Sequence, residues 1–170
     1  MKLPPHAVHL DGELFDRAFR HAIDVQARVI RERRSTVYEI DGLTAADQFH
    51  WTLQGAYAEA GIAKLLGYEW TGPTGRGAFD VGGWIEVRSV DNRSRGLKVK
   101  QKDLHRPDHT PFVLALCGYN TRRAIVQARG WMTVRDVWNI GEHYHQKGIE
   151  YARVPSSDLR PMEELYELRN

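Results

Sequence analysis

The fold is decided by a stretch of ten residues, Phe79-Asp80-Val81-Gly82-Gly83-Trp84-Ile85-Glu86-Val87-Arg88. Gly82-Gly83 predicts a tight turn, and the alternation that follows it predicts a strand from Trp84 to Val90. Such a strand places Glu86 and Arg88 on one face and apolar residues on the other. Because desolvating an unpaired carboxylate is costly, a glutamate within a half-buried strand needs an ionic partner or a metal ion. The stretch therefore predicts an acidic site beside a turn.

Asp80 precedes the turn and Glu86 follows it, so strand–turn–strand geometry can bring their carboxylates together. Two carboxylates held close to each other repel, and a divalent cation relieves that repulsion. Ligand sets made only of oxygen favour Mg²⁺ or Mn²⁺ over zinc. The alternative is an internal ion pair between Arg88 and one of the two carboxylates. The residues alone leave both interpretations open.

Two helices are predicted before this stretch. Residues 12–32 carry apolar side chains at helical spacing. A second helix is predicted to begin after Thr44, a suitable N-cap, and to end at Gly67. Within it, Glu59 is surrounded at three and four residues by small side chains, so the helix can pack close to a sheet and present the carboxylate there. A surface glutamate on an alanine-rich helix is the alternative.

Strands are predicted after the stretch. Residues 97–101 alternate again, so they are expected to form a hairpin with the strand 84–90. Residues 111–117 are almost continuously apolar, which is typical of a strand buried on both faces. A further strand is predicted at 123–131 and a short helix at 133–140, followed by a mixed pattern over 141–170. Helices followed by a sheet indicate an α/β or α+β fold.

The 170 residues fit one compact domain, 1–170, and the composition is ordinary for a globular protein, with 42% hydrophobic and 27% charged residues. The one cysteine, Cys117, lies in an apolar run and is interpreted as a core residue, so no disulfide is expected within the chain. The N-terminus lacks the apolar segment of a signal peptide, and no run approaches the length that spans a membrane. We therefore expect a cytoplasmic protein without a membrane partner.

Basic residues are concentrated in two places. Residues 88–106 hold seven basic residues against Asp91 and Asp103, and a second cluster lies at 28–34. Such asymmetry suits a surface that contacts a polyanion, although solvated faces are the simpler explanation for each cluster alone. The histidine pairs His105 with His109 and His143 with His145 fit no zinc pattern, so they are interpreted as exposed loop residues.

A helix bearing Glu59, a segment bearing Asp80 and a strand bearing Glu86 follow one another in an order that resembles the PD-(D/E)XK nucleases, and in particular small phage and prophage members. Residues 55–67 resemble the first-helix signature and residues 79–88 the catalytic hairpin. The resemblance covers roughly residues 44–138, with a weaker similarity at 154–159. The later strands of the family are matched by Leu97-Lys98-Val99-Lys100, Phe112-Val113-Leu114-Ala115-Leu116 and Ala128-Arg129-Gly130-Trp131-Met132.

The resemblance implies a restriction-endonuclease-like core at 44–138, in which helices flank a mixed central sheet, with the helix 12–32 before it and an extension at 141–170 after it. It implies that Asp80 and Glu86 bind Mg²⁺ or Mn²⁺ with help from the Val87 carbonyl, and that Glu59 holds a second metal or a metal-bound water. The activity implied is hydrolysis of DNA phosphodiesters, in phage DNA processing or recombination. The host cytoplasm would then be the compartment, and a homodimer is expected because many such nucleases dimerise.

The family usually has lysine where this chain has Arg88. Guanidinium stays protonated, so Arg88 is expected to clamp the scissile phosphate and not to manage a proton. Lys98 or Lys100 is expected to supply the missing ammonium, with Lys100 favoured and only one of the two facing the site. The residues expected to bind DNA are Arg93, Arg95, Lys98 and Lys102.

Two other functions remain open from the sequence. A catalytically impaired nuclease-fold module would bind DNA or a partner protein, with Arg88 marking the lost chemistry. A small-molecule enzyme of mixed α/β fold would have an acidic cluster that is only structural.

Overall fold

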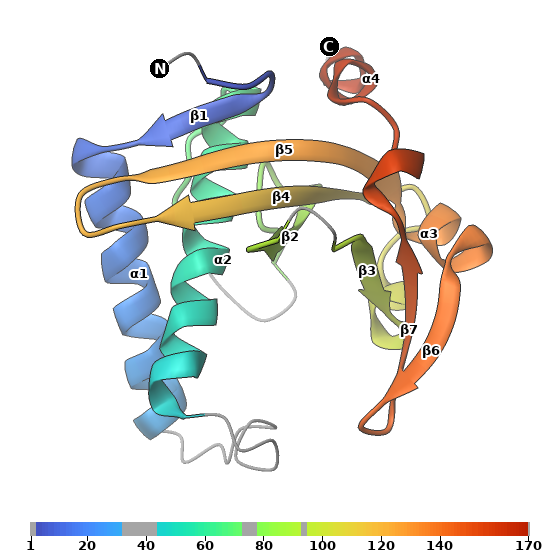
Figure 1. Cartoon of the computed structure of the whole chain (residues 1–170), viewed down its shortest axis with the longest axis horizontal. Helices are drawn as coiled ribbons and strands as arrows, with labels where there is room; N and C mark the ends of the chain where they lie inside the picture. Colours follow the sequence, from blue (N-terminus) through green and yellow to red (C-terminus); the bar gives the residue numbers. More distant parts are fainter. Residues whose placement is uncertain (1–2, 32–43, 73–77, 93–94, 170) are drawn as a thin grey trace.

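A computed structural model describes residues 3–31, 44–72, 78–92 and 95–169 (Figure 1). Its helices and strands, in chain order, are β1 (Ala7–Leu10), α1 (Gly12–Arg31), α2 (Ala45–Leu66), β2 (Glu86–Val90), β3 (Leu97–Lys100), β4 (Pro111–Tyr119), β5 (Ala124–Thr133), α3 (Val134–Ile140), β6 (Glu142–Gln146), β7 (Ile149–Val154) and α4 (Met162–Leu168). Short 3₁₀ helices lie at Gln101–His105 and Ser156–Asp158. The α+β class is confirmed. Within the described ranges, no helix is both long and apolar enough to span a membrane.

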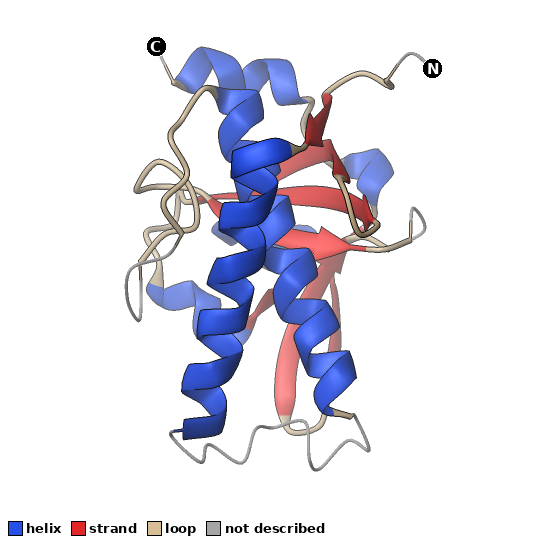
Figure 2. Ribbon diagram, turned by 90° about the vertical axis from the view of Figure 1, so that its left-hand side faces the viewer, coloured by secondary structure: helices blue, strands red, loops and turns tan. Residues whose placement is uncertain are grey.

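The strands form two sheets. The larger sheet has the order β1-β5-β4-β2, with β2 parallel to β4 and the other pairs antiparallel, and the smaller antiparallel sheet has the order β3-β7-β6. The helices α1 and α2 cover one face of the larger sheet (Figures 1 and 2). The smaller sheet and α3 pack against β4 and β5 on the other face, because Phe112 and Leu114 share a core with Val99 and Val154. Helices were expected to flank the central sheet. In the structure α1 and α2 cover one face of the larger sheet, whereas the second sheet and the short helix α3 cover the other.

The helix α2 begins and ends as the sequence predicts. Thr44 closes a capping box with Asp47 at the N-terminus, and Gly67 ends the helix at φ 67°, a left-handed conformation that favours glycine. Small residues let α2 approach the sheet closely. A Cβ added at Gly61 would lie 2.5 Å from the Cβ of Val126 in β5. This close packing brings Glu59, two residues earlier, to the seam between helix and sheet.

The expected hairpin between the strands 84–90 and 97–101 is wrong. β2 pairs with β4, with Glu86 opposite Phe112, while β3 pairs with β7 in the other sheet. The alternating pattern correctly identifies the buried residues of β3, Leu97 and Val99. It does not identify the partner strand, because β4 is buried on both faces and offers an apolar edge to β2.

The buried stripe of α1 also differs from the pattern. Phe15, Ala18 and Ala22 are buried, whereas Phe19 and Ile23 are exposed. The aromatic ring of Phe15 stacks on Tyr57 of α2, with 4.8 Å between ring centroids. Small alanines next to this contact let the two helices lie close together, and Phe19 stays partly exposed with its ring edge-on to that of Phe49, 6.2 Å between ring centroids.

Replacing Gly61 by alanine should lower the free energy of unfolding by about 1–3 kcal/mol, because the new methyl group would overlap the side chain of Val126. Urea titration followed by circular dichroism measures this loss. Gly55→Ala is the matched control, since its new Cβ would meet only Glu59 Oε1 at 4.0 Å. Helix propensity should make that control neutral or stabilising by up to about 1 kcal/mol. Equal effects of the two substitutions would contradict the close packing at Gly61.

Candidate active site

The site is built around Val87, in the outermost strand of the larger sheet. Asp80 Oδ2 accepts a hydrogen bond from the Val87 N–H at 2.8 Å, and Arg88 Nη1 donates to the Val87 carbonyl at 3.2 Å. Charged side chains therefore satisfy backbone groups that a neighbouring strand would otherwise bind. The turn at Gly82 (φ 60°) and Gly83 (φ 78°) returns the chain so that Asp80 lies beside β2.

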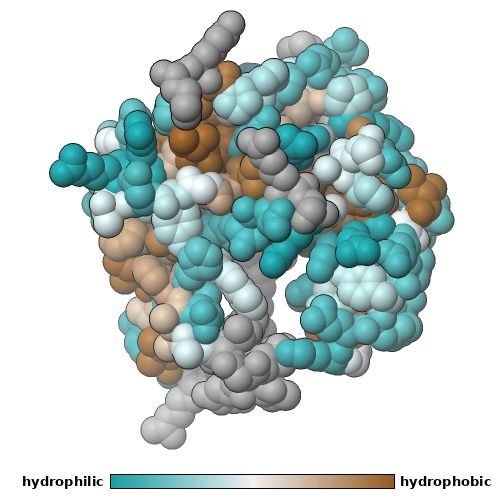
Figure 3. Space-filling model, in the orientation of Figure 1, coloured by the Kyte–Doolittle hydropathy of each residue, from teal (hydrophilic) through white to brown (hydrophobic). Residues whose placement is uncertain are grey.

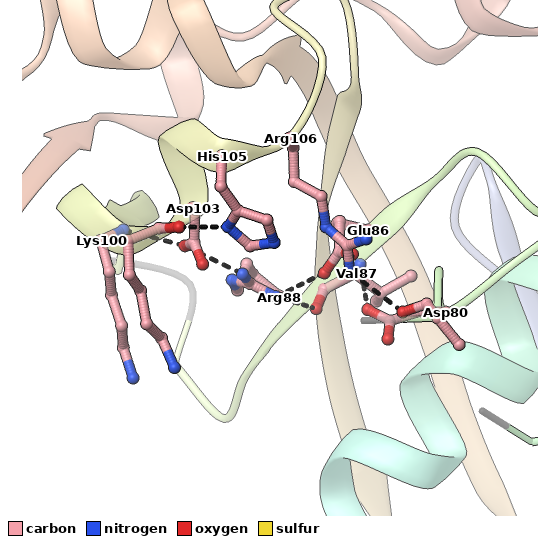
Figure 4. Close-up of polar contacts among 10 residues, drawn as sticks. Asp80, Glu86, Val87, Arg88, Lys100, Asp103, His105 and Arg106 are labelled. Atoms are coloured by element: carbon pink, nitrogen blue, oxygen red, sulfur yellow. Dashed lines mark hydrogen bonds and ion pairs between the residues drawn. The ribbon is translucent and has the colours of Figure 1, made fainter. Parts of the chain in front are cut away.

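Glu86 is paired with two arginines, as Figure 4 shows. Its Oε1 lies 2.5 Å from Arg106 Nη2, and its Oε2 lies 3.3 Å from Arg88 Nη1. The other terminal nitrogen of Arg88 bonds Asp103 at 3.0 Å. Asp103 also accepts a hydrogen bond from the backbone N–H of Lys100 at 2.9 Å. The alternative considered from the sequence, an ion pair between Arg88 and Glu86, is thus present. The additional pair of Arg88 with Asp103 links β2 to the 3₁₀ segment that follows β3.

Aromatic rings lie beneath both guanidinium groups. Arg88 lies 4.7 Å from the ring centroid of Phe112, and Arg106 lies 4.3 Å from that of Phe79. Arg106 also donates to the Ala78 carbonyl at 3.0 Å. These contacts fix the two cations in place, because a guanidinium is attracted to the face of a ring.

The pKa values of the three predicted carboxyl groups are all raised. Burial is the largest cause for Glu59, Asp80 and Glu86, and the charge of Asp80 raises the pKa of the other two further. Hydrogen bonding to the Val87 N–H partly offsets the rise at Asp80. The three carboxylates, which come from α2, the turn segment and β2, therefore interact electrostatically.

Glu59 Oε2 is buried and has no hydrogen-bond partner. The indole of Trp70 favours the charged form of Glu59 and lowers its pKa somewhat, yet the Trp70 N–H is itself without a hydrogen bond. A buried oxygen without a partner is rare in folded proteins and calls for an explanation such as an ion or water.

The charge of the cluster suits a divalent cation. Four carboxylates interact here with two guanidinium groups, which leaves a formal excess of two negative charges. The carboxylates are Glu59, Asp80, Glu86 and Asp103, and the guanidinium groups are those of Arg88 and Arg106. Either bound protons or a cation with two charges can neutralise this excess.

Among the described residues, no group of three or more histidine, cysteine, aspartate or glutamate side chains is arranged to hold a metal ion. Arg88 and Arg106 lie against both oxygens of Glu86, so a metal ion bound to Glu86 would have to displace one of them. The residues fit Mg²⁺ or Mn²⁺ in donor type and in charge, and the guanidinium groups compete with the metal for Glu86.

The two lysines of β3 do not behave as expected. Lys98 and Lys100 lie two residues apart, so both project from the same side of the strand, opposite to Leu97 and Val99. The expectation that only one of them faces the site is wrong. The Lys100 side chain points away from Asp80 and Glu86 (Figure 4), and its Nζ lies 5.9 Å from the ring centroid of Tyr151. Burial lowers the pKa of Lys100, and the charges of Lys102 and Arg88 lower it further.

The structure describes three of the four residues expected to bind DNA. Arg95 is exposed and lies 3.6 Å from Asp91, Lys98 Nζ lies 5.5 Å from the ring centroid of Tyr144, and Lys102 is exposed. Arg93 lies outside the described residues.

Sequence reasoning missed Asp103 and Arg106 as members of the cluster. Both lie in a polar segment without periodicity, so no pattern indicated that they face β2. The available signal was an acidic residue within a basic run, and the structure shows that this residue, Asp103, is only 7% exposed.

No protein-family model, no curated protein and no solved structure matches this chain.

Glu59→Gln should raise the free energy of unfolding at pH 8 by about 0.5–2 kcal/mol, the usual range for a stabilising substitution. Because the folded-state pKa of Glu59 lies above the ordinary value of 4.5, protonation stabilises the folded chain. That contribution is complete below pH 4.5 and is lost as the pH rises through the folded-state pKa. The stabilising effect of the substitution should therefore fade toward pH 4.5. Urea unfolding over this pH range is the measurement.

Glu164→Gln on α4 is the matched control, because Glu164 is exposed. It should change stability by less than about 0.5 kcal/mol at either pH. A Glu59→Gln variant that is less stable than the wild type at pH 8 would contradict the interpretation of Glu59 as a strained, desolvated carboxylate.

Proposed function

We propose that this chain is a divalent-metal-dependent nuclease that hydrolyses phosphodiester bonds in DNA, on a restriction-endonuclease-like core. One observation carries the proposal. Carboxylates from three separate elements, Glu59, Asp80 and Glu86, interact electrostatically, Asp80 accepts a hydrogen bond from the Val87 N–H, and the buried Glu59 Oε2 has no hydrogen-bond partner. Strained carboxylates of this kind concentrate at functional sites.

Asp80, Glu86 and the Val87 carbonyl would hold Mg²⁺ or Mn²⁺, with Glu59 as a further ligand or as the partner of a bound water. When bound, the metal supplies Lewis-acid chemistry that polarises a phosphodiester and lowers the pKa of water. The Val87 carbonyl lies on the side of β2 away from β4, where Arg88 Nη1 donates to it, so a metal bound there would replace this hydrogen bond.

The arginines have different roles in this proposal. Arg88 is half-buried, so its guanidinium can exchange a carboxylate contact for a phosphate oxygen and stabilise developing negative charge. Arg106 is more deeply buried, with 13% of its side chain exposed, and keeps Glu86 in position. A homodimer of this chain would present one such site to each strand of a duplex.

Asp80→Asn should lower Mg²⁺- or Mn²⁺-dependent DNA cleavage by at least about 100-fold, more than the loss of an outer-shell partner usually causes. The assay covers linear, supercoiled, single-stranded and branched DNA. Asp91→Asn in the polar turn after β2 is the matched control and should cleave as the wild type does. Asp91 is exposed and lies outside the carboxylate cluster, with an ion pair to the exposed Arg95.

A second readout does not depend on cleavage. Mg²⁺ should raise the melting temperature of the wild type and of Asp91→Asn, but not that of Asp80→Asn, because a ligand stabilises only a fold that binds it. Absence of cleavage of every DNA form by the wild type would overturn the enzyme proposal.

A catalytically impaired module that binds DNA is the second candidate. It is favoured by the position of Arg88, which spans Glu86 and Asp103, and by the orientation of Lys100 away from the carboxylates. This candidate predicts salt-sensitive DNA binding without cleavage by the wild type. It also predicts that Arg88→Lys, which restores the usual residue of the family, gains metal-dependent cleavage.

A further inference from the structure

A hollow lies between the beginning of α2 and the turn that joins β6 to β7. It has a volume of about 620 Å³ and runs along the 3₁₀ segment that follows β3. Figure 3 shows the molecule hollowed between the α1–α2 side and the β6–β7 side, with hydrophilic residues along the latter.

The walls of this hollow combine positive charge with aromatic rings. Lys100, Lys102 and Lys147 line it against a single carboxylate among its described lining residues, that of Glu150. On the α2 side the large ring of Trp51 contributes to the wall, and 46% of the residue is exposed. Cations alone suit any polyanion. The exposed part of the indole in the same wall offers a flat apolar face on which a ligand can stack.

The hollow continues toward the proposed active site. Lys100 and Tyr151 also line a smaller neighbouring hollow of about 190 Å³, which reaches Arg88. Arg88 in turn pairs with Glu86. Because they share Lys100 and Tyr151, we treat the two hollows as one basic track from Arg88 to Trp51, with Lys98 as a further cation along it.

A duplex would use only part of this track. In double-stranded DNA the bases are stacked inside, so the duplex presents phosphates to the lysines and no base face to an indole. In a single strand every base offers such a face, and stacking on an aromatic side chain depends little on sequence.

We propose that the track binds a single-stranded segment of DNA, with its phosphates along the lysines and one base stacked on Trp51. This inference rests on the proposed function and narrows it. The substrate would be DNA with unpaired nucleotides next to the cleavage point, as in a single strand, a flap or a branch.

The experiment measures binding without metal, so that no cleavage is required. Fluorescence anisotropy compares the wild type on a short labelled oligothymidylate and on a blunt duplex of the same length. The wild type should bind the single strand more tightly. Trp51→Ala should weaken single-strand binding by about tenfold, the lower range of base–aromatic stacking, and should change duplex binding by less than twofold.

Two variants make the comparison specific. Trp51→Phe keeps an aromatic ring and should retain most of the single-strand affinity. Ile140→Ala removes another exposed apolar side chain, on α3, and should bind as the wild type does. Melting curves show whether each variant is folded. If Trp51→Ala is unfolded, Trp51→Phe still decides the question, because a full loss of single-strand affinity in a folded Trp51→Phe protein contradicts stacking.

Equal loss of single-strand and duplex affinity in Trp51→Ala, or no loss of either, would overturn the inference. These outcomes are separable from a failure of the proposed nuclease. Tight single-strand binding without metal-dependent cleavage contradicts only the nuclease proposal. Only the proposed track is contradicted if the wild type shows no preference for single strands and Trp51→Ala cleaves blunt duplex at the wild-type rate.

Discussion

The pairing of β2 with β4 is the constraint on which the site depends. Its parallel register sets Glu86 opposite Phe112, so Val87 faces the core under α2 while Glu86 and Arg88 face the second sheet. The backbone of Val87 is then left at the sheet edge, where Asp80 and Arg88 bind it. Every other member of the cluster is placed relative to this edge: Glu59 by the close approach of α2, and Asp103 and Arg106 by the segment that follows β3.

The cluster lowers the stability of the fold. Burial raises the pKa of Glu59, Asp80 and Glu86, which means that the folded chain would be more stable if these three groups were neutral. Two arginines offset only part of the charge. A fold selected for stability alone would place apolar residues here, since well-packed apolar residues often replace buried ion pairs without loss. Retaining the carboxylates makes sense where a cation is to be bound.

Local features of the fold could be predicted from the sequence, and its pairings could not. Thr44 and Gly67 mark the ends of α2 because capping is a local interaction. The apolar run of β4 and the buried position of Glu86 also follow from short patterns. The partner of β2 depends on which strand edge is free once the helices have packed. A short stretch of sequence carries no information about that edge. For the same reason, the sequence did not show that Arg106 pairs with Glu86. The two side chains are in direct contact, but twenty residues separate them along the chain.

The most direct test of the central claim is a calorimetric titration of the protein with Mn²⁺ near neutral pH, in two buffers of different ionisation enthalpy. If the carboxylate cluster is a cation site whose charge is otherwise neutralised by protons, binding is saturable and releases protons, so the observed heats differ between the buffers. Saturable binding with no proton release, or no saturable binding in the millimolar range, would contradict the claim that this cluster exchanges protons for a divalent cation.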